Sequence, residues 1–137
     1  MNLIPITPSL GAEVEGLDLT QPLSSEQVRV LQSAFETHHV LVFRDQVLNR
    51  EAHKAFARYF GDIHVHPSKQ NLKQDEDSDL FFIDIKPDSK QSNGETWHAD
   101  ITCEARPPYA SMLYLTRVPD NLGGDTLFAN LQAAFEE

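Results

Sequence analysis

Residues 96–100 (TWHAD) carry side chains of the types that bind metal ions. In an extended chain, residues i and i+2 project from the same face, so His98 and Asp100 would point together while Ala99 points away. An imidazole nitrogen and a carboxylate oxygen could then take neighbouring positions on one ion. Two histidines and one carboxylate on one face of an octahedron leave three positions open, as iron(II) oxygenases require. The spacing predicts His98 and Asp100 as two of the three protein ligands of a non-haem iron(II) site.

A His-x-Asp tripeptide is by itself a weak signal, because such tripeptides arise by chance and often form an ordinary surface His–Asp pair. Its surroundings strengthen the prediction. The pair follows Trp97, a large apolar side chain that we expect to anchor the segment, and it adjoins a polar loop, where functional residues gather.

A third histidine ligand would have to come from earlier in the chain, because all six histidines lie at or before position 98. His64 and His66 would share one face of an extended segment and could complete the site. They could equally form a zinc pair or polar rim residues. A zinc hydrolase using His64, His66, His98 and Asp100 therefore stays open.

The remaining histidines and the single cysteine have simpler interpretations. His38 and His39 are expected to end a helix, where histidine favours the negative end of the dipole. His53 is expected to be exposed on a second helix. Cys103 has no base at a matching spacing, so we expect a small packing residue, and one cysteine excludes an intrachain disulfide.

The composition predicts one soluble, cytoplasmic domain over residues 1–137. The net charge is −10, from 21 acidic and 11 basic residues, which argues against nucleic acid because phosphate binding needs clustered lysine and arginine. The start of the chain lacks the pattern of a signal peptide, and no apolar stretch is long enough to span a membrane.

Periodicity predicts two helices early in the chain. Ser24 begins the first, with Gln27 at the capping-box spacing, and Asn49 caps the second, which Gly61 ends. Their apolar faces are expected at 28, 31 and 35 and at 52, 56 and 60. Strands are expected at 3–7, 11–19, 40–43, 80–85, 109–118 and 126–128. Loops are expected at 68–79 and 86–94, and Asn130 is expected to cap a helix that contains Leu131, Ala134 and Phe135. The fold class predicted is α+β, mainly β, with an antiparallel barrel or sandwich as its core.

Six segments, in order, resemble the taurine dioxygenase (TauD/TfdA) family of iron(II)- and 2-oxoglutarate-dependent dioxygenases. They are GAEVEGLDLT at 11–20, LVFRDQ at 41–46, FGDIHVHP at 60–67, WHADIT at 97–102, PP at 107–108 and GGDTLF at 123–128. Together the six are far more specific than any one of them, and they span nearly the whole chain.

The resemblance implies a double-stranded β-helix (jelly-roll) core with flanking helices. It implies that His98 and Asp100 bind Fe(II), that Thr126 helps hold the carboxylate of 2-oxoglutarate, and that O2 is the second cosubstrate. It also implies that the third iron ligand and the arginines that bind 2-oxoglutarate lie beyond Glu137, so that the chain corresponds to the N-terminal part of the family domain.

The substrate residues follow the family only in part. His66 matches the family histidine that contacts a sulfonate, whereas Lys69 replaces an aromatic hydroxyl. Gly94 stands where the family has an asparagine, with Asn93 one place earlier. The expected substrate is therefore a small anion, either taurine, another sulfonate, an alkyl sulfate or a carboxylate.

The sequence thus predicts hydroxylation of such a substrate, coupled to conversion of 2-oxoglutarate to succinate and CO2. The alternative is a truncated, non-catalytic metal-binding or interaction module, whose strand edges would favour self-association into a homo-oligomer. Whether a segment with a histidine and arginines follows Glu137 would distinguish the two.

Overall fold

The computed structural model describes residues 1–65, 79–85, 96–120 and 123–137. They form two compact units, one of residues 1–60 with 113–137 and one of residues 61–112. The regular elements are β1 (Asn2–Pro5), β2 (Ala12–Glu15), α1 (Ser25–His38), β3 (Leu41–Val42), α2 (Arg50–Ala57) and α3 (Leu131–Glu136). All six belong to the first unit, while the described part of the second unit consists of extended segments and turns.

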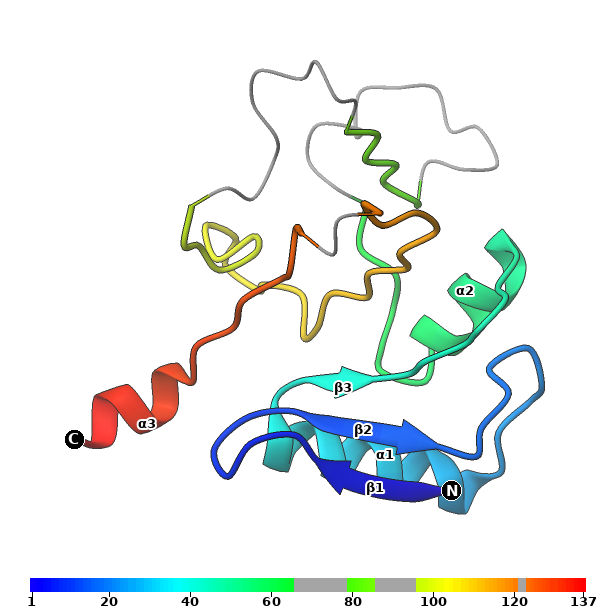
Figure 1. The fold of residues 1–137 in the computed structure, drawn as a ribbon, viewed down its shortest axis with the longest axis horizontal. Helices are drawn as coiled ribbons and strands as arrows, with labels where there is room; N and C mark the ends of the chain where they lie inside the picture. The colour runs from blue at the N-terminus through cyan, green and yellow to red at the C-terminus, as the bar shows by residue number, and fades with distance from the viewer. Residues whose placement is uncertain (66–78, 86–95, 121–122) are drawn as a thin grey trace. The chain divides into compact units, whose positions relative to one another are not determined.

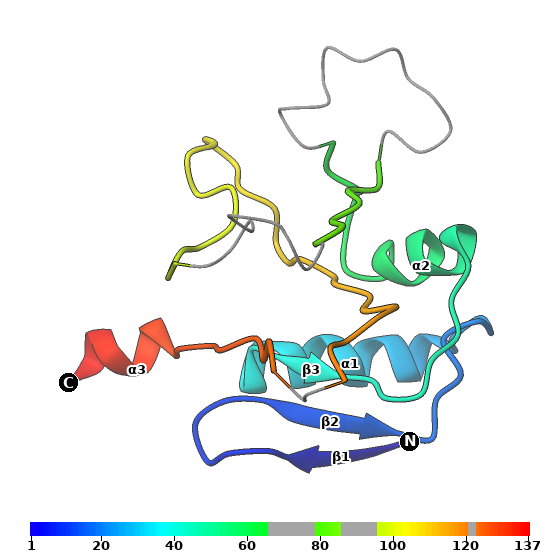
Figure 2. The same cartoon turned by 45° about the horizontal axis from the view of Figure 1, so that its top comes forward.

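A three-stranded sheet with α1 against it forms the base of the first unit (Figure 1). β2 lies in the middle, antiparallel to β1 and parallel to β3. α1 connects the two parallel strands and lies along the sheet in both views (Figure 2). Ala12 and Val14 are two residues apart, so they share one face of β2, and both are buried.

The predicted capping box begins α1. The Ser24 hydroxyl accepts from the backbone N–H of Gln27, while the Gln27 side chain accepts from the N–H of Ser24. Leu31 and Ala34 are buried on the helix face that covers the sheet. His38 lies in the last turn and His39 forms the C-cap in the left-handed conformation, φ 61°, which confirms that this pair ends the helix.

Aromatic rings join α2 to this layer. Phe56, buried on α2, contacts Phe43 at a ring-centroid distance of 5.2 Å and Phe60 at 5.7 Å. Phe60 in turn meets Phe35 of α1 edge to face at 5.8 Å. As predicted, Asn49 caps α2, its side chain accepting from the N–H of Ala52 at 2.8 Å.

The residues that follow β3 are held by the side chain of Gln46. Its oxygen accepts from the N–H of Leu19 at 3.0 Å, and its amide donates to the carbonyl oxygens of Leu17 and Arg44 at 3.1 and 2.9 Å. Tyr114 adds a second link, because its hydroxyl donates to the carbonyl of Gln46 and accepts from the N–H of Leu48, both at 3.1 Å. Apart from the bond to Arg44, these bonds connect residues that are 27 to 68 positions apart in sequence.

The prediction of an α+β chain is confirmed, but the described residues are not mainly β. The helices have 14, 8 and 6 residues and the strands 4, 4 and 2. The strands predicted at 80–85, 109–118 and 126–128 are not formed, although all three lie within the described residues. Periodicity reports the alternation of side chains, whereas a strand also needs a neighbour for its backbone hydrogen bonds.

Many apolar side chains in these later segments are exposed, including Phe82 and Ile85 at 61% and 59%, Leu113 and Leu115 at 62% and 60%, and Phe135 at 90%. The side chains still alternate in exposure along residues 111–115, so the pattern seen in the sequence is present without the pairing. Within the described residues, no helix has the length and apolar character needed to cross a membrane. The segments predicted as loops at 68–79 and 86–94 lie outside the described residues, apart from Asp79.

Replacing Gln46 by alanine should lower the free energy of unfolding by about 1–2 kcal/mol, because part-buried backbone groups lose their hydrogen-bond partners. Urea denaturation followed by circular dichroism measures the change. Gln132→Ala is the control, since that amide donates to the Glu136 carboxylate within α3 and such pairs contribute a few tenths of a kcal/mol. Equal effects of the two substitutions would contradict the role given to Gln46.

Asp18 is expected to make a pH-dependent contribution to the free energy of unfolding. A hydrogen bond from the Thr20 hydroxyl, with a second from the Thr20 N–H, lowers the pKa of the Asp18 carboxyl below its ordinary value. A lowered folded-state pKa stabilises the fold above the unfolded pKa, and this stabilisation is lost as the pH falls through the folded value. Asp18→Asn should therefore destabilise the chain near neutral pH, and the difference from the unsubstituted chain should vanish in acid. A difference that grew in acid would refute this assignment.

Candidate metal centre

His98 lies in an extended stretch, residues 97–99, and Asp100 begins the turn that follows it. The prediction assumed an extended chain here, and in the described structure these residues form no strand. The predicted consequence nevertheless holds. The two side chains point together, with His98 Nε2 3.3 Å from Asp100 Oδ1.

The contact of the other nitrogen of His98 determines which tautomer the neutral ring adopts. Nδ1 lies 2.7 Å from the backbone oxygen of Thr96. A carbonyl oxygen only accepts hydrogen bonds, so Nδ1 carries the hydrogen and, in a neutral imidazole, Nε2 is left with a free lone pair. Metal-binding histidines in proteins are oriented in this way by a carbonyl or a carboxylate.

The two oxygens of the Asp100 carboxylate also have different partners. Its Oδ2 accepts a hydrogen bond from the Ser111 hydroxyl at 2.6 Å, while Oδ1 is the oxygen that faces His98. In each of the two side chains, one polar atom is hydrogen-bonded elsewhere in the protein and the other faces the second side chain.

Two lone-pair atoms that face each other repel unless a positive charge lies between them. With a neutral His98, Nε2 and Oδ1 are such a pair, and either a proton or a metal ion would stabilise their arrangement. Ligands about 2.1 Å from one ion and at right angles to each other are about 3 Å apart, and the observed 3.3 Å is close to that separation. The geometry fits an ion with cis imidazole and carboxylate ligands.

As a plain ion pair the contact would contribute little to folding. The two side chains are 53% and 55% exposed, and exposed pairs are worth about 0–1 kcal/mol. Their exposure also leaves both ligand atoms open to an ion from solution.

The turn after Asp100 has a strained backbone, and its Glu104 side chain contacts His64, which lies outside the turn. Ile101 has φ 51°, a left-handed conformation that is unusual for a β-branched residue. The Glu104 N–H donates to the carbonyl of Ile101 at 3.3 Å. Both carboxylate oxygens of Glu104 lie 3.1 Å from Nε2 of His64, which ties the turn to the segment after α2.

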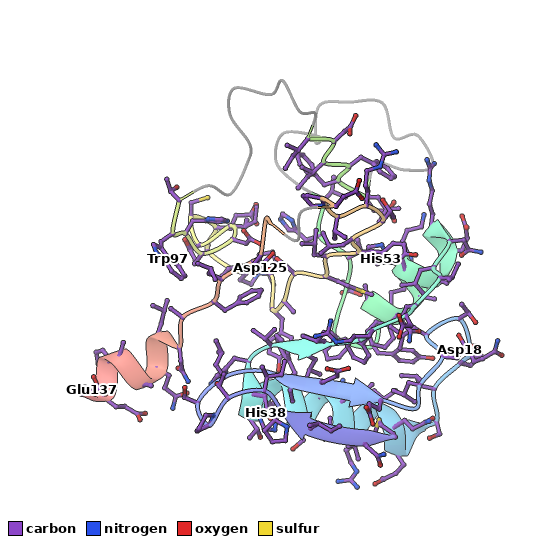
Figure 3. The ribbon with its side chains drawn as sticks, in the orientation of Figure 1. Asp18, His38, His53, Trp97, Asp125 and Glu137 are labelled. Atoms are coloured by element: carbon purple, nitrogen blue, oxygen red, sulfur yellow. The ribbon has the colours of Figure 1, made fainter. Side chains whose placement is uncertain are left out.

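Several predictions about neighbouring side chains are corrected. Trp97, labelled in Figure 3, is 70% exposed and is not a buried anchor. Cys103 is exposed rather than packed, because it lies on the turn. His53, also labelled, is half-buried instead of exposed, since its ring packs edge to face on Tyr114 with centroids 6.1 Å apart.

Thr126 is exposed and belongs to the first unit, whereas His98 and Asp100 belong to the second. His66 and Asn93 lie outside the described residues, as do Lys69 and Gly94. In the described parts of the chain, no three histidine, cysteine or acidic side chains cluster as a metal site, so His64 does not join the pair there as the zinc alternative requires.

Three partners of the site were missed from the sequence: the Thr96 carbonyl, Ser111 and Glu104. The bond between Ser111 and Asp100 spans 11 residues and that between His64 and Glu104 spans 40. Neither separation corresponds to a strand or helix period, so no spacing signal could have found them.

The model of the family "Taurine catabolism dioxygenase TauD, TfdA family" matches residues 2–137. The chain belongs to this family. The expectation drawn from the six sequence segments is thus confirmed, and the centre formed by His98 and Asp100 lies within the matched residues.

Curated relatives support the same family. The chain is 30% identical to an alpha-ketoglutarate-dependent sulfate ester dioxygenase of Pseudomonas putida, over 100% of this chain and 44% of that protein. It is 32% identical to an alpha-ketoglutarate-dependent 2,4-dichlorophenoxyacetate dioxygenase of Cupriavidus pinatubonensis, over 96% and 50%. It is also 32% identical to an alpha-ketoglutarate-dependent sulfonate dioxygenase of Saccharomyces cerevisiae, over 96% and 34%. The chain spans half or less of the length of each of these relatives.

The contact between His64 and Glu104 should be measurable as a coupling energy. The side chains are 28% and 29% exposed, so a double-mutant cycle with His64→Asn and Glu104→Gln should give a coupling of about 0.5–1 kcal/mol in the free energy of unfolding. The pair Arg44 and Glu13 of the first unit, joined at 3.0 Å, provides a reference cycle. Strictly additive effects of the His64 and Glu104 substitutions would show that this tie does not form.

Proposed function

We propose that the chain supplies His98 and Asp100 as ligands of iron(II) in a dioxygenase that uses 2-oxoglutarate and O2 to hydroxylate a small anionic substrate. The products besides the hydroxylated substrate are succinate and CO2. The single observation that carries the proposal is the pair of ligand atoms, His98 Nε2 and Asp100 Oδ1, directed at each other at 3.3 Å while their companion atoms are held by Thr96 and Ser111.

The protein's part in this chemistry is positioning. Iron(II), when bound, would supply open coordination positions and the redox chemistry by which 2-oxoglutarate and O2 react. The neutral ring of His98, oriented by the Thr96 carbonyl, presents the Nε2 lone pair toward Asp100. Asp100 supplies a negative charge that favours a divalent ion. Neither side chain has to reorganise when the ion arrives.

Thr126 is proposed to donate its hydroxyl hydrogen to a carboxylate oxygen of 2-oxoglutarate, and its exposure leaves that hydroxyl free to do so. His66 and Asn93 are proposed as substrate contacts on the family resemblance. The third iron ligand and the arginines for 2-oxoglutarate are not assigned to residues of this chain.

An anionic substrate is supported by the relatives. Sulfate esters, sulfonates and 2,4-dichlorophenoxyacetate, which appear in the names of the three relatives described above, all carry an anionic group. Because the chain has a net charge of −10, it provides no general attraction for anions. A local donor such as His66 would have to bind the anionic group. Taurine, another sulfonate or an alkyl sulfate fits this requirement.

The proposal includes a jelly-roll core and a cytoplasmic location. The alternating exposure along residues 111–115 is the side-chain pattern of a barrel strand. Leu113 and Leu115, each about 60% exposed, would be covered when such a strand is part of a closed barrel.

A second candidate is a non-catalytic metal-binding or interaction module. One observation favours an interaction module. Large apolar side chains of the first unit, such as Leu127 and Phe135, are 71% and 90% exposed, and exposed apolar side chains mark surfaces that bind partners.

Anaerobic titration with Fe(II), before and after addition of 2-oxoglutarate, tests the leading proposal in a protein that holds this chain together with the third iron ligand. A weak visible charge-transfer band should develop with 2-oxoglutarate. His98→Ala and Asp100→Ala should each weaken Fe(II) binding by more than about a hundredfold, since even outer partners of metal ligands contribute 10- to 100-fold. His38→Ala, a histidine of the first unit, should leave binding unchanged.

Three results would contradict the leading proposal. Fe(II) binding that ignores both substitutions would remove His98 and Asp100 from the metal site. Fe(II) binding that needs both residues but gives neither a band with 2-oxoglutarate nor succinate under air would favour the non-catalytic module. Tight Zn(II) binding with no band would favour a hydrolase.

A further inference from the structure

Ser111 makes the one described contact that determines which oxygen of Asp100 is free. We infer that Ser111 is a positioning residue that holds Asp100 as a monodentate ligand, with only Oδ1 presented to the metal. The inference rests on the proposed function and extends it to a residue outside the His-x-Asp motif.

The hydrogen bond has the features of a strong one. Ser111 Oγ lies 2.6 Å from Asp100 Oδ2, a distance typical of a hydroxyl that donates to an ionised carboxylate. Both residues are exposed, so burial does not force the hydroxyl to find a partner at this oxygen. The bond also closes the segment that runs from Asp100 through the turn to Ser111.

A carboxylate has two oxygens and can bind a metal through one or both. Bidentate binding would use one more of the six positions of an octahedral ion. A site with two histidines and a monodentate carboxylate keeps three positions open, which is what a bidentate cosubstrate and O2 together require. Because the Ser111 hydroxyl engages Oδ2, the carboxylate binds through one oxygen and three positions of the ion stay open.

The geometry around Asp100 agrees with this role. Oδ1 faces His98 Nε2 at 3.3 Å, and Oδ2 is engaged by Ser111. The backbone beyond Asp100 turns sharply at Ile101, whose φ is 51°, and Ser111, eleven residues after Asp100, returns to its carboxylate. The carboxylate is thus fixed at its backbone end and at one oxygen.

Titration of the chain with Co(II) tests the inference, because the absorption of this ion in the visible region reports both affinity and coordination number. Ser111→Ala should weaken Co(II) binding by about 10- to 100-fold and change the visible spectrum of the bound ion, since Asp100 is then free to bind through both oxygens. Ser111→Thr retains the hydroxyl and should restore the affinity and spectrum of the unsubstituted chain. Ser33→Ala, at an exposed serine of α1, is the matched control.

Circular dichroism and the thermal midpoint of each variant separate a folding defect from a binding effect, because an exposed serine should tolerate alanine within about 0.5 kcal/mol. Co(II) affinity and spectrum unchanged in Ser111→Ala would overturn the inference and leave the proposed function standing, as would a loss of stability alone. Failure of the unsubstituted chain to bind Co(II) would overturn the metal site, and the inference with it.

Discussion

The proposed chemistry of this chain depends on the contact between two lone-pair atoms, His98 Nε2 and Asp100 Oδ1, which lie 3.3 Å apart. They face each other because the Thr96 carbonyl engages Nδ1 and the Ser111 hydroxyl engages Oδ2. With a neutral His98, this arrangement is electrostatically unfavourable unless a proton or a metal ion lies between the two atoms. The turn at Ile101 and the link from Glu104 to His64 fix the backbone on one side. In the proposed function these contacts would preorganise the two side chains for a cation.

The first unit explains several of the family segments in structural terms. LVFRDQ at 41–46 forms β3, supplies Phe43 to the aromatic cluster and ends in Gln46, whose amide binds the backbone of the GAEVEGLDLT segment. Arg44 pairs with Glu13 of β2 at 3.0 Å. These segments thus serve the fold. The WHADIT segment is different, because the side chains of His98 and Asp100 are more than half exposed and their Nε2 and Oδ1 atoms face each other.

Local signals in the sequence predicted local structure well. The capping box at Ser24, the Asn49 and Asn130 caps and the end of α1 at His38 are all confirmed, since each depends on residues within one helical turn. The strands at 80–85, 109–118 and 126–128 were wrong because alternation does not specify a pairing partner. The pairing of His98 with Asp100 followed from extended geometry even without a strand. The contacts of Ser111 and Glu104 depend on how a turn folds back, which no periodicity encodes.

The protonation of His98 in the metal-free chain tests the central claim most directly. Long-range ¹H–¹⁵N NMR of the histidine side chains distinguishes the two neutral tautomers and shows which nitrogen binds when a diamagnetic ion such as Zn(II) is added. The account predicts the Nδ1–H tautomer of His98 before metal and a large shift confined to Nε2 afterwards. An Nε2–H tautomer, or an Nε2 signal that does not respond to metal, would show that His98 and Asp100 form only a surface pair.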